Sequence, residues 1–207
     1  MKLIGMLDSP YVRRVAISLD RLGVPFTHEA VSVFAGYARF ALINPVVKAP
    51  TLVCDDGTVL MDSSLILQFI ENVAPRDAHL WAFDRVERQA EFRTVGLALA
   101  ACEKTLQVVL EQNLRPPETR YAPWLQRVGE QLAAAWAALE CDLAARPAAL
   151  SSSVNQAAIT TAVAWQFTQT MLAGLVPAAD HPAVAALSAR MEQTPVFKKY
   201  PPVGVAA

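Results

Sequence analysis

The chain has 207 residues, of which 54% are hydrophobic and 18% are charged, and its formal net charge is −1 at pH 7. This length suits one or two domains, and this hydrophobic content supports sizeable cores and argues against a disordered chain. The balanced charge gives no electrostatic case for binding nucleic acid or an anionic membrane surface.

The three cysteines, Cys54, Cys102 and Cys141, are scattered and form no C-x-x-C pair. We therefore expect buried or half-buried free thiols, and neither a disulfide framework nor a metal site. No basic start followed by an apolar stretch marks a signal peptide, and no uncharged apolar run is long enough to cross a membrane. These features predict a cytoplasmic protein in a reducing compartment, with no part in a membrane.

The first part of the chain predicts a strand–helix–strand unit, whose strands pair in parallel because a helix connects them. The strands cover residues 2–7 and 26–33, and the helix covers residues 10–22. Ser9 suits the N-cap of this helix, and Pro10 suits its first position, where the missing N–H has no consequence.

After residues 34–43, which predict a loop with a short helix, the pattern predicts an antiparallel hairpin and then another helix. Asn44-Pro45 interrupts regular secondary structure, and Ala49-Pro50 leads directly into a strand. The hairpin turns at Asp56-Gly57, and Asp62-Ser63 starts the next helix. The strands cover residues 51–54 and 59–61, and the helix ends near residue 73.

The chain beyond a linker that ends near residue 84 predicts only helices, because apolar residues recur there at helical spacing. Asn155 suits the N-cap of the third of these helices, and Ser153 with Gln156 provides a substitute capping box. The predicted helices cover residues 85–113, 118–146, 156–175 and 182–193.

These motifs stand in a characteristic order: Ser9-Pro10-Tyr11, then N-P-x-x-K-x-P-T-L at residues 44–52, then Asp56-Gly57 and Asp62-Ser63. In that order they resemble the glutathione transferase family. The resemblance continues through the helical half, to His181-Pro182 and Thr194-Pro195-Val196-Phe197, and so covers nearly the whole chain.

The resemblance implies an α/β thioredoxin-like N-terminal domain over residues 1–77, which binds glutathione. It also implies an all-α C-terminal domain over residues 85–207, which contributes the pocket for the second substrate. Pro50 follows a cis peptide bond in that family. The family forms two-fold homodimers, and the helix at residues 85–113 has more apolar positions than one face can bury, which also favours a dimer.

By the resemblance, Ser9 corresponds to the serine that activates glutathione in serine-type, bacterial-like members. A thiol with a pKa of about 8.5 is only a few per cent thiolate at neutral pH, and the thiolate is the nucleophile. A hydroxyl donor at a helix N-terminus favours that charged form. Serine in place of cysteine argues against disulfide-exchanging and peroxide-reducing members. A plain helix cap is the alternative role of Ser9.

The resemblance implies further glutathione contacts on both sides of the hairpin. Asp62 takes the α-amino group of the γ-glutamyl part, and Ser63 with the helix amides takes its α-carboxylate. Asp62 and Ser63 are also ordinary N-cap residues, and both roles can hold together. The backbone of Ala49, before Pro50, pairs with the cysteinyl part, and Lys48 either reaches the glycyl carboxylate or is solvated.

The leading hypothesis is a detoxifying glutathione transferase that joins glutathione, as co-substrate and without a metal, to a small hydrophobic electrophile. The alternative is a non-catalytic transferase-like regulator or binding protein that acts through protein contacts. The pocket for the electrophile is expected between the domains, near residues 97–111 and 115–121, whose composition names no substrate. Val47 stands where the family often has glycine, and Arg13 and Arg14 are expected to be solvated or at an interface.

Overall fold

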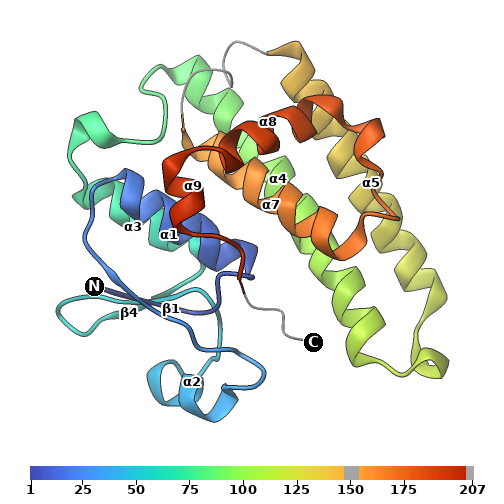
Figure 1. Ribbon diagram of the computed structural model, residues 1–207, viewed down its shortest axis with the longest axis horizontal. Helices are drawn as coiled ribbons and strands as arrows, with labels where there is room; N and C mark the ends of the chain where they lie inside the picture. The colour runs from blue at the N-terminus through green and yellow to red at the C-terminus, as the bar shows by residue number, and fades with distance from the viewer. Residues whose placement is uncertain (147–153, 204–207) are drawn as a thin grey trace. The chain divides into compact units, whose positions relative to one another are not determined.

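A four-stranded mixed sheet forms the centre of the first of two units in the computed structural model, which describes residues 1–146 and 154–203 (Figure 1). The first two strands pair in parallel, and the last two form an antiparallel hairpin, as predicted. The strand order is β2-β1-β3-β4, with β1 at Lys2–Ile4, β2 at Thr27–Glu29, β3 at Thr51–Val53 and β4 at Val59–Met61.

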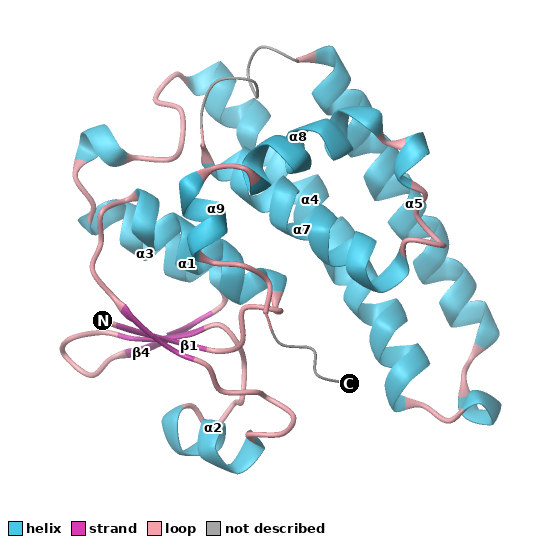
Figure 2. Ribbon diagram, viewed as in Figure 1, coloured by secondary structure: helices cyan, strands magenta, loops and turns pink. Residues whose placement is uncertain are grey.

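Helices cover both faces of this sheet (Figure 2). α1 (Pro10–Arg21) and α3 (Ser63–Val73) pack against each other on one face, and α2 (Tyr37–Ile43) covers the opposite face. Between α2 and the sheet, Ile4, Val31 and Phe40 form a buried apolar cluster. The resulting α/β layers are those expected of a thioredoxin-like domain.

The two strands of the parallel pair are shorter than predicted, because a glycine with positive φ follows β1. Gly5 has a φ of 136°, and a Cβ at this position would lie 2.6 Å from Cγ2 of Val12. Only glycine fits both the backbone angle and the space. β2 is an edge strand that pairs with β1, and its last residue, Glu29, lies opposite the last residue of β1, Ile4.

The second unit, Trp81–Glu192, is helical in its described residues. α4 packs against α5 and α7, and α7 packs against α8, around the rings of Trp136 and Trp165, which meet edge to face at 5.0 Å. α5 begins later than predicted, because Pro117–Thr119 forms a separate 3-10 turn. The bounds are Arg85–Leu114 for α4, Ala122–Ala145 for α5, Gln156–Leu172 for α7 and Pro182–Glu192 for α8.

The N-terminus of α7 has the cap that the sequence predicts. The side-chain oxygen of Asn155 accepts a hydrogen bond from the N–H of Ala158 at 2.8 Å. Its amide nitrogen donates to Oε1 of the buried Glu91 at 2.9 Å, and Oε2 of Glu91 accepts from the N–H of Ala82 at 2.8 Å. Glu91 therefore ties α4 to the start of α7. Ser153, the other half of the predicted substitute box, lies outside the described residues.

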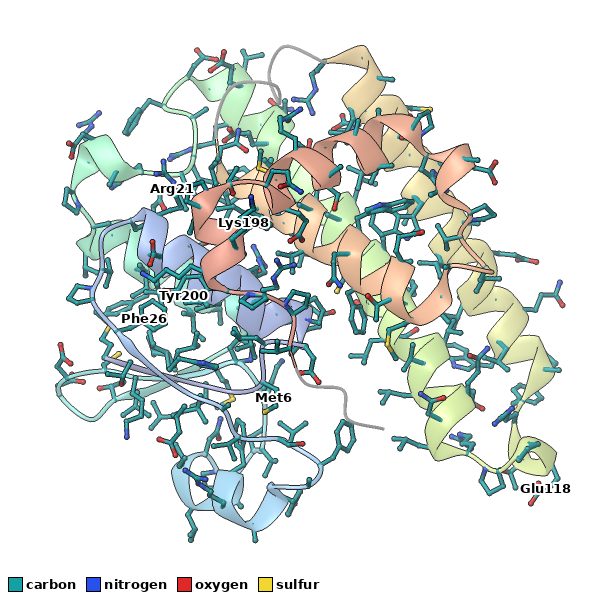
Figure 3. The ribbon with its side chains drawn as sticks, in the orientation of Figure 1. Met6, Arg21, Phe26, Glu118, Lys198 and Tyr200 are labelled. Atoms are coloured by element: carbon teal, nitrogen blue, oxygen red, sulfur yellow. The ribbon has the colours of Figure 1, made fainter. Side chains whose placement is uncertain are left out.

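The C-terminal residues from Gln193 group with residues 1–80, although the sequence-based range for the helical domain runs to residue 207. The short helix α9 (Pro195–Lys199) packs against α1. Arg13 of α1 contacts this C-terminal segment. Its Nε donates to the carbonyl of Tyr200 at 2.8 Å, and its guanidinium lies 5.2 Å from the ring centre of Phe197. Tyr200 also stacks on Phe26 at 5.9 Å (Figure 3). Arg13 is 1% exposed, so the expected solvated position is wrong.

Candidate functional site

The register of the sheet brings three chain segments to one edge. Ile4 of β1 lies opposite Thr51 of β3, and Thr51 lies opposite Met61 of β4. The chain therefore leaves β1, enters β3 and leaves β4 at the same edge. The predicted site residues stand in these segments: Ser9 after β1, Lys48, Ala49 and Pro50 before β3, and Asp62 and Ser63 after β4.

Ser9 lies immediately before α1, at the N-cap position, and is half-buried. Its carbonyl accepts the N–H of Arg13 at 2.9 Å, which is the first hydrogen bond of the helix. Its side chain makes no capping hydrogen bond, although serine at this position usually makes one. The helix therefore does not use the Ser9 hydroxyl, which is a property expected of a hydroxyl that serves a ligand.

Asp8 brings a carboxylate to the start of the same helix. Burial raises the pKa of Asp8 above its ordinary value of 3.8, and hydrogen bonds from the N–H groups of Ser9 and Asp8 partly offset that effect. A negative charge here disfavours a second negative charge nearby. Next to Asp8, the Ser9 hydroxyl and the N-terminal dipole of α1 are the groups that would favour an anion.

Asp62 caps α3. Its Oδ1 accepts hydrogen bonds from the N–H groups of Ser64 at 2.9 Å and Leu65 at 3.3 Å. Its φ is 70°, a left-handed conformation that is uncommon outside glycine and that concentrates at functional sites. Oδ2 lies 3.7 Å from Nζ of Lys48, so one carboxylate oxygen serves the helix and the other faces a cation.

The loop before β3 contacts the end of β1. The Ala49–Pro50 peptide bond is cis, as the resemblance implies. A Cβ built on Gly5 would lie 3.2 Å from the Cβ of Ala49, so these two backbones approach each other closely. Ala49 is half-buried and Lys48 is exposed, which leaves the loop accessible on the side that faces Asp62.

Comparison with known proteins supports the family suggested by these motifs. Residues 3–78 match the model of the glutathione S-transferase N-terminal domain. The chain is 38% identical over 77 residues to the uncharacterised GST-like protein YibF of Escherichia coli, covering 36% of this chain and 38% of that protein. It is 31% identical over 126 residues to glutathione S-transferase U3 of Arabidopsis thaliana, covering 54% of this chain and 55% of that one. These matches thus span about a third to just over half of the curated relatives' lengths.

The fold agrees over the whole chain. A solved glutathione S-transferase from Methylobacterium radiotolerans, in complex with glutathione sulfonate, superposes with a TM-score of 0.90. It is 27% identical, and the alignment covers 100% of this chain and 96% of that one. Residues 3–78 are thus a glutathione S-transferase N-terminal domain, and the whole chain has the fold of a glutathione S-transferase. The predicted thioredoxin-like fold followed by helices is that of its relatives.

Arg14 is a residue beside the candidate site that the sequence reasoning missed. It is 2% exposed, so the expected solvated position is wrong, and its Nη1 donates to Oγ of Ser63 at 3.1 Å and of Ser64 at 3.3 Å. A hydroxyl that accepts one hydrogen bond still has its own proton to donate. Arg14 therefore orients Ser63 so that its O–H points away from the guanidinium.

The sequence of α1 contains no signal for the burial of Arg14. Val12, Val15, Ala16 and Leu19 lie on one face of this amphipathic helix, and Arg14 lies on the opposite face.

Two negative findings apply to the described residues. Across residues 1–146 and 154–203, no group of three or more His, Cys, Asp or Glu side chains is arranged to hold a metal ion. In the same part of the chain, no helix has both the length and the apolar character needed to cross a membrane. None of the three cysteines forms a disulfide, and Cys141 is exposed rather than buried.

Proposed function

We propose that this protein binds glutathione at the edge of the sheet where the three segments meet, and that it transfers the glutathionyl group to a small hydrophobic electrophile. The observation that carries the proposal is the Ser9 hydroxyl, which makes no capping hydrogen bond although it lies at a helix N-terminus. A thiol placed there receives a hydroxyl donor and the positive end of the α1 dipole, which both favour the thiolate. Ser9 is thus the catalytic residue of a serine-type transferase.

The opposite end of glutathione is assigned to the start of α3. Ser63 and the N-terminal amides of the helix hold the α-carboxylate, with the buried positive charge of Arg14 behind them. Asp62 holds the α-amino group through Oδ2, the oxygen that the cap does not use. The ligand ammonium then replaces the Lys48 ammonium, and Lys48 turns to the glycyl carboxylate.

The middle of glutathione is assigned to the loop before β3. The backbone N–H and C=O of Ala49, next to Pro50, pair with the cysteinyl part as an added strand does. This assignment brings the thiol toward Ser9, because Ala49 packs against Gly5 at the end of β1. A non-catalytic binding protein is not favoured, because the residues for binding and the hydroxyl for activation lie at one edge of the sheet.

The decisive experiment is a calorimetric titration with glutathione, followed by turnover assays with a panel of electrophiles. The proposal expects saturable binding, and conjugation of at least one hydrophobic electrophile faster than with free glutathione. Binding without turnover across the panel would favour the regulator hypothesis. No binding at millimolar glutathione would contradict the proposal itself.

We also propose a homodimer, on the basis of an exposed apolar stripe along α3. Leu65, Phe69 and Val73 follow one another at intervals of four residues, and their exposed fractions are 62%, 39% and 54%. Such a stripe on one helix face is typical of an interface. The family likeness makes a second copy of this chain the partner.

Phe69→Glu is expected to convert the dimer to a monomer, because it introduces a charge into an apolar interface that then has to bury it. Sedimentation at micromolar concentration measures the change. Gln68→Glu, which adds the same charge at the exposed neighbouring position, is the matched control and should remain dimeric. A wild-type monomer under these conditions would contradict the proposal.

A further inference from the structure

Two polar side chains are buried behind the loop that carries Lys48, Ala49 and Pro50. Asn44 is 2% exposed and Thr51 is fully buried. Neither belongs to the set of residues assigned to glutathione. Buried polar groups are destabilising unless they are hydrogen-bonded, so their partners show what they do.

The partners of Asn44 and Thr51 form one chain of hydrogen bonds. Nδ2 of Asn44 donates to Oγ1 of Thr51 at 2.9 Å, and Oγ1 of Thr51 donates to the carbonyl of Lys48 at 2.7 Å. Oδ1 of Asn44 accepts from the N–H of Val46 at 3.0 Å. The Thr51 hydroxyl is thus acceptor and donor at once, which fixes its direction and strengthens both bonds.

The same two residues connect this loop to the strand that leads into α3. Thr51 lies opposite Met61 in the β3–β4 ladder, and Met61 directly precedes Asp62. Nδ2 of Asn44 also lies 3.8 Å from Sδ of Met61. The network therefore contacts one segment that is assigned to glutathione, at Lys48, and the residue directly before the other, Met61.

The loop also has a strained backbone that needs such support. Val47 has a φ of 51°, which is a true outlier for a β-branched residue, and its N–H donates to the carbonyl of Asn44 at 2.9 Å. Strained residues persist only where the surroundings hold them, and they are found at ligand sites. The hydrogen bond from Thr51 holds the carbonyl of the next residue, Lys48.

We propose that Asn44 and Thr51 are positioning residues, which fix the segment Lys48–Pro50 relative to Asp62 and Ser63 and thereby set the affinity for glutathione. Neither side chain touches the ligand. The inference rests on the proposed glutathione binding, because it concerns the geometry of that same site.

Thr51→Val tests the proposal, since valine keeps the shape of threonine and removes the hydroxyl. We expect the Kd for glutathione to rise about tenfold, equivalent to about 1.4 kcal/mol, which is the size of one net hydrogen bond. Thr51→Ser keeps the hydroxyl and should stay within about twofold of the wild type. Both are measured by calorimetry on folded protein, well below the melting temperature of each variant.

Thr168→Val is the matched control for a loss of stability alone. Thr168 in α7 is also fully buried, and its hydroxyl bonds the hydroxyl of Thr105 at 2.8 Å. Removing it should lower the melting temperature as Thr51→Val does, because each change removes a hydrogen bond made by a fully buried threonine hydroxyl. The Kd for glutathione should not change.

The outcomes separate the two proposals. A tenfold higher Kd in Thr51→Val, with rescue by Thr51→Ser and no effect of Thr168→Val, supports the positioning role. An unchanged Kd in folded Thr51→Val overturns it while glutathione binding stands. If Thr51→Val does not fold, Asn44→Ala, which removes the hydrogen bonds to Thr51 and Val46 and buries no charge, provides the same comparison. A wild-type protein that does not bind glutathione overturns the proposed function instead.

Discussion

Replacing Asp62 with asparagine is expected to weaken glutathione binding by about 1.5–3 kcal/mol, the range for a hydrogen bond to a charged group. The stability of the free protein should change little. Asparagine keeps the oxygen that accepts the N–H groups of Ser64 and Leu65, so the cap of α3 remains. Only the negative charge that would hold the ligand ammonium is lost.

Asp62→Ala should produce both effects at once. It removes the charge, and it also removes the cap of α3, which is worth about 0.5–2 kcal/mol of stability. Ser63 is not a substitute cap, because its hydroxyl accepts a hydrogen bond from Arg14 inside the protein. Asp62 and Ser63 both suit an N-cap by their sequence, and in the structure Asp62 is the one that caps α3.

Calorimetric titration with glutathione and thermal unfolding of the free protein measure the two effects separately. The loss of the exposed Lys48–Asp62 ion pair is common to both variants and contributes little. If Asp62→Asn binds glutathione like the wild type, while Asp62→Ala only lowers the melting temperature, Asp62 is a helix cap and nothing more.

The position of the candidate site followed from local patterns. Each of the three segments has its own signal in the sequence: Ser9-Pro10 at a helix start, Ala49-Pro50 before a strand, and Asp62-Ser63 at another helix start. Only the strand order was needed to join them, and the hairpin turn at Asp56-Gly57 fixes most of it. The N–H of Thr58 bonds Oδ1 of Asp56 at 2.9 Å, which is the local turn chemistry that the sequence predicts.

The parts that were not predicted depend on contacts between residues far apart in the chain. Arg13 bonds Tyr200, 187 positions away, and Arg14 bonds Ser63, 49 positions away. A pair of arginines in a helix is an ordinary solvated feature when only its neighbours are considered. Its burial follows from which elements pack around α1, and periodicity within one helix does not contain that information.

Asn44 and Thr51 show a related limit. The sequence predicts an interruption of secondary structure at Asn44-Pro45 and a strand at Thr51. Both predictions are right, because α2 ends at Ile43 and β3 begins at Thr51. Their hydrogen bonds exist because the loop between them folds back on itself at Val47, whose positive φ is contrary to the preference of valine. Conformational propensity describes the backbone angles that each residue type prefers, so it cannot predict a residue in an unfavoured backbone conformation.

Replacing Ser9 with alanine is expected to raise the apparent pKa of the bound glutathione thiol and to lower turnover at neutral pH by a corresponding factor. If the Ser9 hydroxyl and the start of α1 together lower that pKa from about 8.5 to about 6.5, they supply roughly 2.7 kcal/mol toward the thiolate. Alanine removes the hydroxyl and keeps the helix dipole, so much of this stabilisation should be lost. Helix stability should change little, because the Ser9 side chain makes no capping hydrogen bond.

Ultraviolet absorbance of the bound thiolate, titrated against pH, measures this change directly. Glutathione affinity should remain nearly constant, because Asp62, Ser63 and Ala49 are assigned to the rest of the tripeptide. Turnover of Ser9→Ala should recover in part at high pH, where the thiol ionises without help. Ser9→Thr keeps the hydroxyl and should remain close to the wild type in both measurements. Coincident titration curves for wild type and Ser9→Ala would make Ser9 a plain residue at a helix start, and a binding protein without catalysis would then be the better description of this chain.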